Sequence, residues 1–600
     1  MRTLIIAEKP SVGRDIARVL SCAKKGDGFL HGEKYIISWA IGHLVSLQEP
    51  EDYEPSLKKW RAGDLPIIPG TMCLKPMPNT ISQLKLLKNL MNDNETADII
   101  CATDSGREGE LIFRYIYKWA GCKKSVKRLW ISSLTDAAIS EGLAKMKPSD
   151  EYNNLYASAR CRAEADWLVG MNATRAFTLS RDELLPMGRV QTPTLAMLVN
   201  RHHEIAAFNA KEFFEVKANF LLENGAEYSG TWLNGEEERT YKKDEADAVA
   251  EKIKNKIGQI ESVETEEKKQ LPPQLFDLTE LQRECNRKLG FSAKKTLEVA
   301  QSLYEKHKLI TYPRTDSRYL SEDIAPKLPK TIESIAANDD YKKFAEYLLG
   351  LPQLPTNSRI VNNAKVSDHH AIIPTGSTKP ISSLSPDEAK VYDRILRNFL
   401  AAFFPAHVYD VTTAITKVED EKFRSKGRVE KIFGWTEIYA HEAAAQTSKI
   451  KSDKNDDATK DTELPALSKG ENATVTAAEV LEKKTQPPKP YTEATLLSAM
   501  ENAGRLIEDE ALKEALKSSG LGTPATRAAI IEKIIASGYV ERIKKNLTPT
   551  EKGIRLISIV PPEMRQPETT GKWERALGKI ARGEMDDTRF MDSIKRYVCY

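Results

Sequence analysis

Long apolar stretches are missing from this sequence of 600 residues, of which 40% are hydrophobic and 29% charged. No run approaches the ~20 apolar residues that span a membrane. The apolar start at Leu4–Ala7 is also too short for a secretion signal. We therefore expect a soluble protein of the cytoplasm.

Closely spaced cysteines are missing as well. The seven cysteines form no Cys-x-x-Cys pair and stand at Cys22, Cys73, Cys101, Cys122, Cys161, Cys285 and Cys599. Zinc ribbons and small secreted disulfide frameworks both need closer spacing. This pattern argues against both classes and favours a reducing compartment.

A strong excess of charge is absent too, because 89 Lys and Arg residues nearly balance 86 Asp and Glu residues, for a net charge of +3. Such a total says little about partners, since only a local basic surface is needed to attract a polyanion. A glycine-rich phosphate loop of the Walker type is also missing, so we expect no use of ATP.

What is present indicates several domains, three to five at roughly 150 residues each. In the N-terminal part, short apolar runs alternate with helix-like segments, which predicts a parallel α/β sheet. The apolar runs are Leu4–Ala7, Tyr35–Trp39, Ile99–Ala102 and Arg128–Ile131.

The rest of the chain changes character several times. Strand-like alternation occurs at 212–263 and again at 408–438, which predicts one β domain with a helical insertion. A linker is expected at 268–273. The polar stretch 446–463 has almost nothing to bury and is expected to be a loop. The helix, strand and basic turn that follow residue 525 suit a winged-helix-like unit.

Carboxylates follow two of the predicted parallel strands. Glu8 follows the first strand, and Asp104 and Glu108 follow a later one. Because ligands gather at the carboxyl ends of strands in open parallel sheets, these acids can converge on one point. Magnesium is the expected ligand, together with phosphate, since Lys9 and Arg107 stand beside the acids. The alternative is that the acids only cap helix N-termini.

The run at 310–317, ITYPRTDS, places a tyrosine beside an arginine. The phenol of tyrosine has a pKa of about 10, so attack on phosphorus needs a proton acceptor and a stabilising cation. Arg314 can hold two phosphate oxygens, and Pro313 stiffens the backbone between it and Tyr312. The alternative is a loop with a packed tyrosine.

These segments resemble one enzyme family. The acids resemble a Toprim domain, in which a Glu follows the first strand and Asp-x-Asp-x-Glu follows a later one, although Gly106 replaces the second Asp here. The Tyr312 segment, preceded by the helix at 301–305, resembles the active-site region of type IA DNA topoisomerases. Other blocks agree in order: Gly42-His43, ARCRAEADWLVGMNATRA at 159–176, GRVQTPTL at 188–195, PPQLFDL at 272–278, DHHAIIPT at 368–375 and GLGTPATR at 520–527. Within the family the chain is most similar to the bacterial topoisomerase III group.

The resemblance implies a multidomain fold of α/β, α and β parts that form a toroid. It implies a Toprim α/β domain at 1–150, and a helical winged-helix-like DNA-binding domain at 151–209 and 486–600. It also implies a β-rich arch at 210–273 and 404–485, and a helical gate at 274–403 that carries the tyrosine.

The resemblance also assigns roles at the site. Tyr312 would attack a phosphate of single-stranded DNA to form a 5′-phosphotyrosyl link, and Arg314 would stabilise the charged phosphorane. Glu8 would move a proton at the leaving oxygen with help from Lys9. His369 matches the family's active-site histidine, the alternative being a structural histidine. The metal ligands would be Glu8, Asp104 and Glu108 around a single magnesium ion.

Residues that would hold the DNA follow from the same comparison: His43, Arg162, Asp166, Arg189, Gln191, Gln301, Glu305, Thr523, Thr526 and Arg527. For Arg162 and Asp166, one helical turn apart, a salt bridge is the alternative. For Thr523, Thr526 and Arg527 it is an ordinary capped helix. Pro186 stands where the family often has a serine, so contacts of that serine are not carried over.

We therefore expect an ATP-independent isomerase that cleaves, passes and rejoins single strands, and that relaxes negatively supercoiled duplex and decatenates linked DNA. A monomer in the bacterial cytoplasm, associated with the nucleoid and with no membrane contact, is expected. One alternative is a non-catalytic clamp on single-stranded DNA whose metal site has decayed, as Gly106 suggests. A Toprim primase or nuclease is another, but it has no use for Tyr312.

Overall fold

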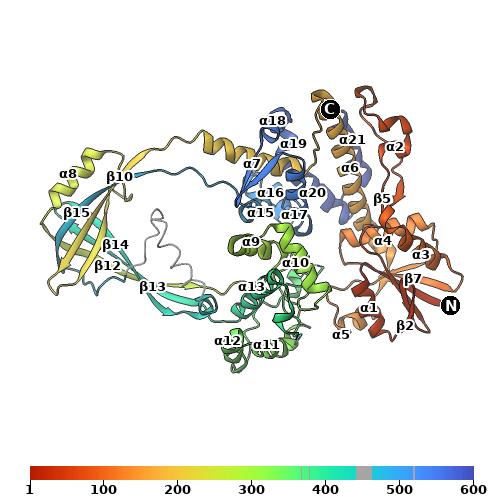
Figure 1. Ribbon diagram of the computed structural model, residues 1–600, viewed down its shortest axis with the longest axis horizontal. Helices are drawn as coiled ribbons and strands as arrows, with labels where there is room; N and C mark the ends of the chain where they lie inside the picture. Colours follow the sequence, from red (N-terminus) through yellow and green to blue (C-terminus); the bar gives the residue numbers. More distant parts are fainter. Residues whose placement is uncertain (367, 378, 441–462, 508, 518–519) are drawn as a thin grey trace.

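The computed structural model describes residues 1–600 except 367, 378, 441–462, 508 and 518–519. Figure 1 shows the described chain as a ring, with a sheet domain near the N-terminus, helical parts beside it and a β barrel at the far end. The expected loop at 446–463 lies outside the described residues apart from Glu463. None of the described helices is long and apolar enough to cross a membrane.

The N-terminal domain is built on a seven-stranded sheet of order β2-β3-β4-β1-β7-β8-β9. Its parallel strands β4, β1, β7 and β8 confirm the predicted α/β sheet. The strands are β1 Arg2–Ala7, β2 Lys24–Gly26, β3 Phe29–His31, β4 Tyr35–Trp39, β7 Thr96–Ala102, β8 Val126–Arg128 and β9 Lys147–Pro148. The predicted bounds of the fourth strand, Arg128–Ile131, were wrong, because β8 ends at Arg128. Leu129 and Ile131 are apolar since they pack on the sheet from outside it.

Helices cover both faces of this sheet, so its strands are buried on both sides. Along β1, Leu4 and Ile6 join the core under α3 and α4, whereas Ile5 and Ala7 join the core under α1 and α5. This alternation follows from the two-residue period of a strand. The further elements are α1 Pro10–Val19, α2 Pro50–Tyr53, α3 Ile81–Asn92, α4 Arg107–Ala120, α5 Asp136–Ala144 and the β5 Val45–Leu47 and β6 Leu74–Pro76 pair.

Strands from two distant parts of the chain close into one barrel, β10-β11-β14-β13-β12-β15, at the left of Figure 1. This confirms the predicted β domain with a helical insertion. The elements are β10 Glu212–Leu222, β11 Glu227–Leu233, α8 Lys243–Ile253, β12 Ile257–Gln270, β13 His407–Val418, β14 Glu421–Ile432 and β15 Asn472–Lys484. The predicted linker at 268–273 was partly wrong. β12 continues to Gln270, and its last residues are exposed on both faces and so show no apolar alternation.

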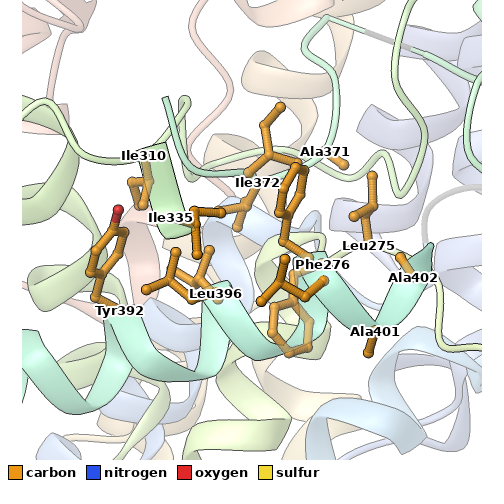
Figure 2. Close-up of a cluster of buried hydrophobic side chains, with 14 of the residues drawn as sticks. Leu275, Phe276, Ile310, Ile335, Ala371, Ile372, Tyr392, Leu396, Ala401 and Ala402 are labelled. Atoms are coloured by element: carbon orange, nitrogen blue, oxygen red, sulfur yellow. The ribbon is translucent and has the colours of Figure 1, made fainter. Parts of the chain in front are cut away.

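The helical insertion between β12 and β13 carries Tyr312. Its helices are α9 Leu278–Leu289, α10 Ala293–Glu305, α11 Leu328–Ala336, α12 Asp339–Leu349 and α13 Pro386–Ala402. They pack around a continuous apolar core, part of which Figure 2 shows. Ile310 and Ile372 lie in this core, each a few residues from a candidate site residue. We call this body the gate.

The remaining helices lie above the gate and beside the sheet domain in the view of Figure 1. They are α6 Asn153–Arg181, α7 Gln191–Ala206, α15 Glu493–Glu501, α16 Glu510–Lys517, α17 Pro524–Ala536, α18 Glu551–Ile559, α19 Pro562–Arg565, α20 Pro567–Ala581 and α21 Asp587–Cys599. Helix α17 leads into the hairpin of β16 Val540–Ile543 and β17 Asn546–Pro549, the order of the predicted winged-helix-like unit. Helices α20 and α21 pack on α6.

Candidate active site

Tyr312 lies where the gate meets the sheet domain. Its ring centroid is 4.0 Å from Lys9 Nζ and 4.4 Å from the ring centroid of His369. Tyr304 on α10 packs edge-on at 5.4 Å and donates to Ser11 Oγ across the domain boundary, at 3.2 Å. The structure therefore brings together Tyr312, His369 and Lys9, which are far apart in the sequence.

Hydrogen bonds to main-chain carbonyls hold the two gate segments of the site together. The Thr311 N–H donates to the Ile373 carbonyl at 2.9 Å, and the Thr315 hydroxyl donates to the His369 carbonyl at 2.8 Å. Ile310, 1% exposed, anchors the first segment in the gate core. The chain is thus held in place both before and after Tyr312.

The strand-end acids converge as predicted. The Asp104 N–H after β7 donates to Glu8 Oε2 after β1, at 3.0 Å. Lys9 Nζ lies 2.5 Å from the Asp104 carboxylate and 3.3 Å from that of Glu8. His369 Nε2 lies 3.3 Å from the Asp104 carboxylate. Two cationic or ionisable groups therefore face Asp104.

The two neighbouring acids differ in protonation. Burial, and then the charge of Asp104, raises the pKa of Glu8 to about 7, against the opposing effect of Lys9. Burial also disfavours the charged form of Asp104, but His369 and Lys9 hold the pKa of that carboxyl well below its usual range. At neutral pH Glu8 can carry a proton while Asp104 stays ionised.

The charges of these acids and of Lys9 also shift the pKa values of Lys9 and Tyr312. Burial lowers the pKa of Lys9, but Asp104 and Glu8 outweigh it and raise that pKa overall. Burial raises the pKa of Tyr312, and the nearby Lys9 ammonium opposes this effect. Lys9 therefore stays charged beside a phenol that favours its neutral form.

Glu108 contacts a different set of residues from the other two acids. Its half-exposed carboxylate accepts from His43 Nε2 at 2.8 Å and lies 3.5 Å from Arg162. Both partners lower its pKa, against the effect of burial. In the described part of the chain, no group of three or more Asp, Glu, His or Cys side chains is already arranged to hold a metal ion.

The chemistry of the donors nevertheless fits a magnesium ion. Glu8 and Asp104 offer carboxylate oxygens at adjacent strand ends, which is the ligand type that magnesium prefers. Gly106 has no side chain, and the space in which one would stand is filled by the carboxylate of Asp368. Glu110, by contrast, is fully buried in an ion pair with Arg128 and serves the core.

A cavity of about 720 Å³ opens beside the acids, between α6, α17 and α20. It collects most of the residues predicted to hold DNA: Arg162, Asp166, Arg189, Gln191, Thr523 and Thr526. Trp60, Trp167 and Arg107 line it as well. Cations and aromatic rings together are the features that bind single-stranded nucleic acid. We call this cavity the groove.

The ion pairs in the groove differ from the salt bridge between Arg162 and Asp166 that was the alternative to DNA binding. Asp166 bonds Arg189 at 2.8 Å, and Arg162 approaches Glu108, so the pair of Arg162 with Asp166 does not form. Glu574 on α20 accepts from Arg189 and from Arg107, each at 3.1 Å. Sequence reasoning missed Glu574, which stands 385 residues from Arg189 and has no local motif.

The predicted DNA contacts at the start of α17 lie in two different cavities. Thr523 and Thr526 share a hydroxyl contact of 3.1 Å at the start of α17, and Gln191 donates to the Pro186 carbonyl at 3.1 Å. Arg527 is only 3% exposed, donates to Thr279 at 2.9 Å and lines a different cavity. It therefore joins α17 to the gate rather than facing the groove.

Arg314 also lies away from the acids. It is exposed and lines a cavity of about 870 Å³ between α10 and α17 together with Gln301, Glu305 and Lys533. Gln301 donates to Glu305 at 2.6 Å. The structure thus places Arg314 in one cavity with two predicted DNA contacts, Gln301 and Glu305.

Comparison with known proteins identifies the family of the chain. A family model described as "Toprim domain" matches residues 3–134, and one described as "DNA topoisomerase" matches residues 150–592. The chain is 42% identical to "DNA topoisomerase 3" of Bacillus cereus over 602 aligned positions, covering all of this chain and 81% of that protein. The protein of the same name from Bacillus subtilis is equally similar, at 42% with the same coverage.

Among solved structures, full-length topoisomerase I from Thermotoga maritima superposes with a TM-score of 0.69. The match covers 99% of this chain and 89% of the other, at 21% identity, and shows that the ring-shaped fold is shared. These findings favour an enzyme over a decayed clamp. The chain belongs to the type IA DNA topoisomerases, a family of isomerases.

Proposed function

We propose that Tyr312 is the nucleophile that cleaves one DNA strand. Its phenol gives its proton to solvent as the oxygen bonds to phosphorus, and the bond to the 3′ oxygen breaks as that oxygen takes up a proton. The products are a 5′-phosphotyrosyl link and a 3′-hydroxyl. The observation that carries this proposal is the packing of Tyr312 against Lys9, at 4.0 Å, beside the Glu8 and Asp104 pair. A strand end held this way can be rejoined without ATP.

Glu8 and Lys9 serve the leaving oxygen in this proposal. With its pKa raised to about 7, Glu8 can give a proton to the departing 3′ oxygen and take it back on rejoining. Lys9 stabilises negative charge at the phosphate and at the Tyr312 oxygen. His369, 4.4 Å from Tyr312 by ring centroids, contributes a further donor on the phosphate side.

Arg314 would engage the DNA from the cavity that it shares with Gln301 and Glu305. Its exposed guanidinium is free to turn towards a phosphate next to the scissile one. We propose that it acts on DNA that lies against α10, because it lines the same cavity as residues of that helix.

Magnesium, where bound, would bring a cation that offsets phosphate charge near the cleaved bond. Glu8 and Asp104 would hold it, and Glu108 stands in the first turn of α4, four residues after Asp104. Because Glu108 is paired with His43 and Arg162, we propose that DNA phosphates compete for these two residues and free its carboxylate.

Single-stranded DNA would lie in the groove, with phosphates on Arg107, Arg162 and Arg189 and on the N-terminus of α17 at Thr523 and Thr526. Gln191 would hold the groove wall at Pro186. Phosphate contacts and stacking give affinity without sequence, so we expect weak sequence preference. The protein would work as a monomer on bacterial nucleoid DNA.

The proposed overall reaction is relaxation of negatively supercoiled DNA and separation of catenated DNA through single-stranded regions. It is tested with a negatively supercoiled plasmid and with catenated gapped circles, in magnesium and without ATP. Wild-type protein should relax and unlink them, and Tyr312→Phe should do neither. A Tyr312→Phe protein that still changes linking number would contradict the proposal.

A further inference from the structure

Position 106 lacks a side chain in a place where the structure supplies a carboxylate from elsewhere. Gly106 precedes the first residue of α4 and follows Asp104 by two residues. A Cβ built on Gly106 would lie 2.6 Å from one carboxylate oxygen of Asp368 and 2.9 Å from the other. The Asp368 carboxylate therefore occupies the volume in which a side chain at 106 would stand.

Asp368 belongs to the gate, whereas Gly106 and Asp104 belong to the sheet domain. The gate segment that carries it continues through His369, whose imidazole approaches Asp104 at 3.3 Å, to the buried Ala371 and Ile372. Ala371 also donates its N–H to the Tyr319 carbonyl at 2.9 Å. The gate core thus fixes the segment that places the Asp368 carboxylate against Gly106.

We propose that Asp368 supplies the acidic centre with the carboxylate that this chain lacks at position 106. The metal site is then shared between two domains, with Glu8 and Asp104 from the sheet domain and Asp368 from the gate. This inference rests on the proposed use of magnesium. A carboxylate from a second body is compatible with magnesium, which needs only one or two protein carboxylates and completes its shell with water and phosphate.

A metal site shared between two domains couples metal binding to closure of the ring. When the gate leaves the sheet domain, Asp368 leaves with it and the affinity for the metal falls. By linkage, the metal favours the closed ring by the same factor. A side chain introduced at 106 in the presence of Asp368 would be crowded, because the contact of 2.6 Å is shorter than real Cβ contacts.

The test measures binding of manganese, a magnesium substitute, to the full chain by electron paramagnetic resonance of the free ion. Five proteins are compared: wild type, Asp368→Asn, Asp368→Ala, Gly106→Asp and the double variant Gly106→Asp with Asp368→Ala. Asp340→Asn, an exposed carboxylate at the start of α12, is the matched control for loss of one gate charge.

Asp368→Asn and Asp368→Ala should weaken manganese binding at least about tenfold, since even outer-shell changes cost that much. The double variant should bind within about threefold of wild type, because an aspartate at 106 restores the carboxylate in cis. Asp340→Asn should bind like wild type. The idea is overturned if Asp368→Asn binds manganese as wild type does, or if the double variant stays as weak as Asp368→Ala.

The failure of this inference can be told from failure of the proposed function. Each protein is also mixed with a single-stranded oligonucleotide in EDTA and quenched with denaturant. A covalent adduct with wild type shows that Tyr312 chemistry is intact whatever manganese does. Manganese affinities that do not depend on Asp368, together with a normal adduct, would overturn the shared site alone.

Discussion

Glu8 and Asp104 share one hydrogen bond yet differ in proton affinity. Asp104 faces both Lys9 and His369, so its charge is stabilised and its pKa is lowered. Glu8 is 8% exposed, and the charge of Lys9 lowers its pKa. The effect of burial is larger, and the pKa of Glu8 rises to about 7. Two adjacent carboxyls whose environments separate their pKa values can divide the roles of proton donor and fixed charge.

Glu8 predicts a pH dependence of cleavage. The proton donor must be protonated, so the single-turnover cleavage rate in EDTA should be level below about pH 7 and fall about tenfold per pH unit above it. Glu8→Gln should cleave slowly and lose this fall. Quenched-flow measurements with a labelled oligonucleotide check it. A rate that rises through pH 7 in wild type would assign the proton transfer to another group.

Lys9 should be essential for cleavage rather than for binding. Lys9→Ala removes the cation nearest to Tyr312 and should slow cleavage about 10²-fold, as loss of one preorganised charge does elsewhere. Lys9→Arg should recover part of the rate. Oligonucleotide affinity should change little, and Lys25→Ala, an exposed lysine on β2, should behave as wild type. Equal losses in both alanine variants would refute a specific role.

At the scale of elements, the gate core positions the site. Leu396 on α13 is 2% exposed in the core of Figure 2, which also holds Ile310 and Ile372. Leu396→Ala should destabilise the gate by about 2–5 kcal/mol. Hydrogen exchange of α13 should speed up accordingly, and adduct yield should fall with it. Leu349→Ala, 40% exposed at the end of α12, should leave both unchanged.

Helix α20 should restrain the groove. Glu574 occupies Arg107 and Arg189, which DNA phosphates would otherwise bind. Glu574→Gln should raise the affinity for single-stranded DNA several-fold at low salt, and should steepen the salt dependence by up to about 0.7 per arginine released. Glu584→Gln, an exposed acid beyond α20, is the control. Weaker binding by Glu574→Gln would show that the acid only positions the arginines.

The sequence predicts those elements whose amino-acid composition reflects how deeply they are buried. The apolar runs of β1, β4 and β7 are buried on both faces, so their composition identified them. The exposed end of β12 carries no such signal, and its sequence predicts a linker instead. The grouping of Tyr312, His369, Glu8 and Lys9 was expected only through the family resemblance.

Contacts between distant segments could not be predicted in this way. Nothing near Glu574 indicates that it will meet Arg189, and nothing near Gly106 indicates that Asp368 will fill its space. Arg527 was expected to face DNA because it follows a phosphate-binding pattern at a helix start. Its hydrogen bond to Thr279 of the gate is a further contact that this pattern does not indicate.

On the scale of the whole molecule, strand passage requires the closed ring to open between gate and sheet domain. Ser133 and Thr135 of the sheet domain both donate to the gate's Asp323, at 2.7 and 2.8 Å. A disulfide between Ser133→Cys and Asp323→Cys, with the exposed Cys599 changed to Ser, should lock this contact.

The oxidised protein should still form the covalent adduct but relax plasmids at least about tenfold more slowly, because the gate cannot separate. Reduction should restore relaxation, which makes each sample its own control. Free thiol counts verify that the bond has formed. Unchanged relaxation by fully cross-linked protein would show that the ring opens elsewhere.

The most direct test of the central claim, that Tyr312 becomes joined to DNA, is a denaturant trap with end-labelled oligonucleotides. Wild-type protein should carry the label of a 3′-labelled strand, whereas a 5′-labelled strand should yield only a shorter free fragment with a 3′-hydroxyl. Tyr312→Phe should yield neither product while still binding DNA. An adduct that persists in Tyr312→Phe, or one that carries the 5′ label, would contradict the account.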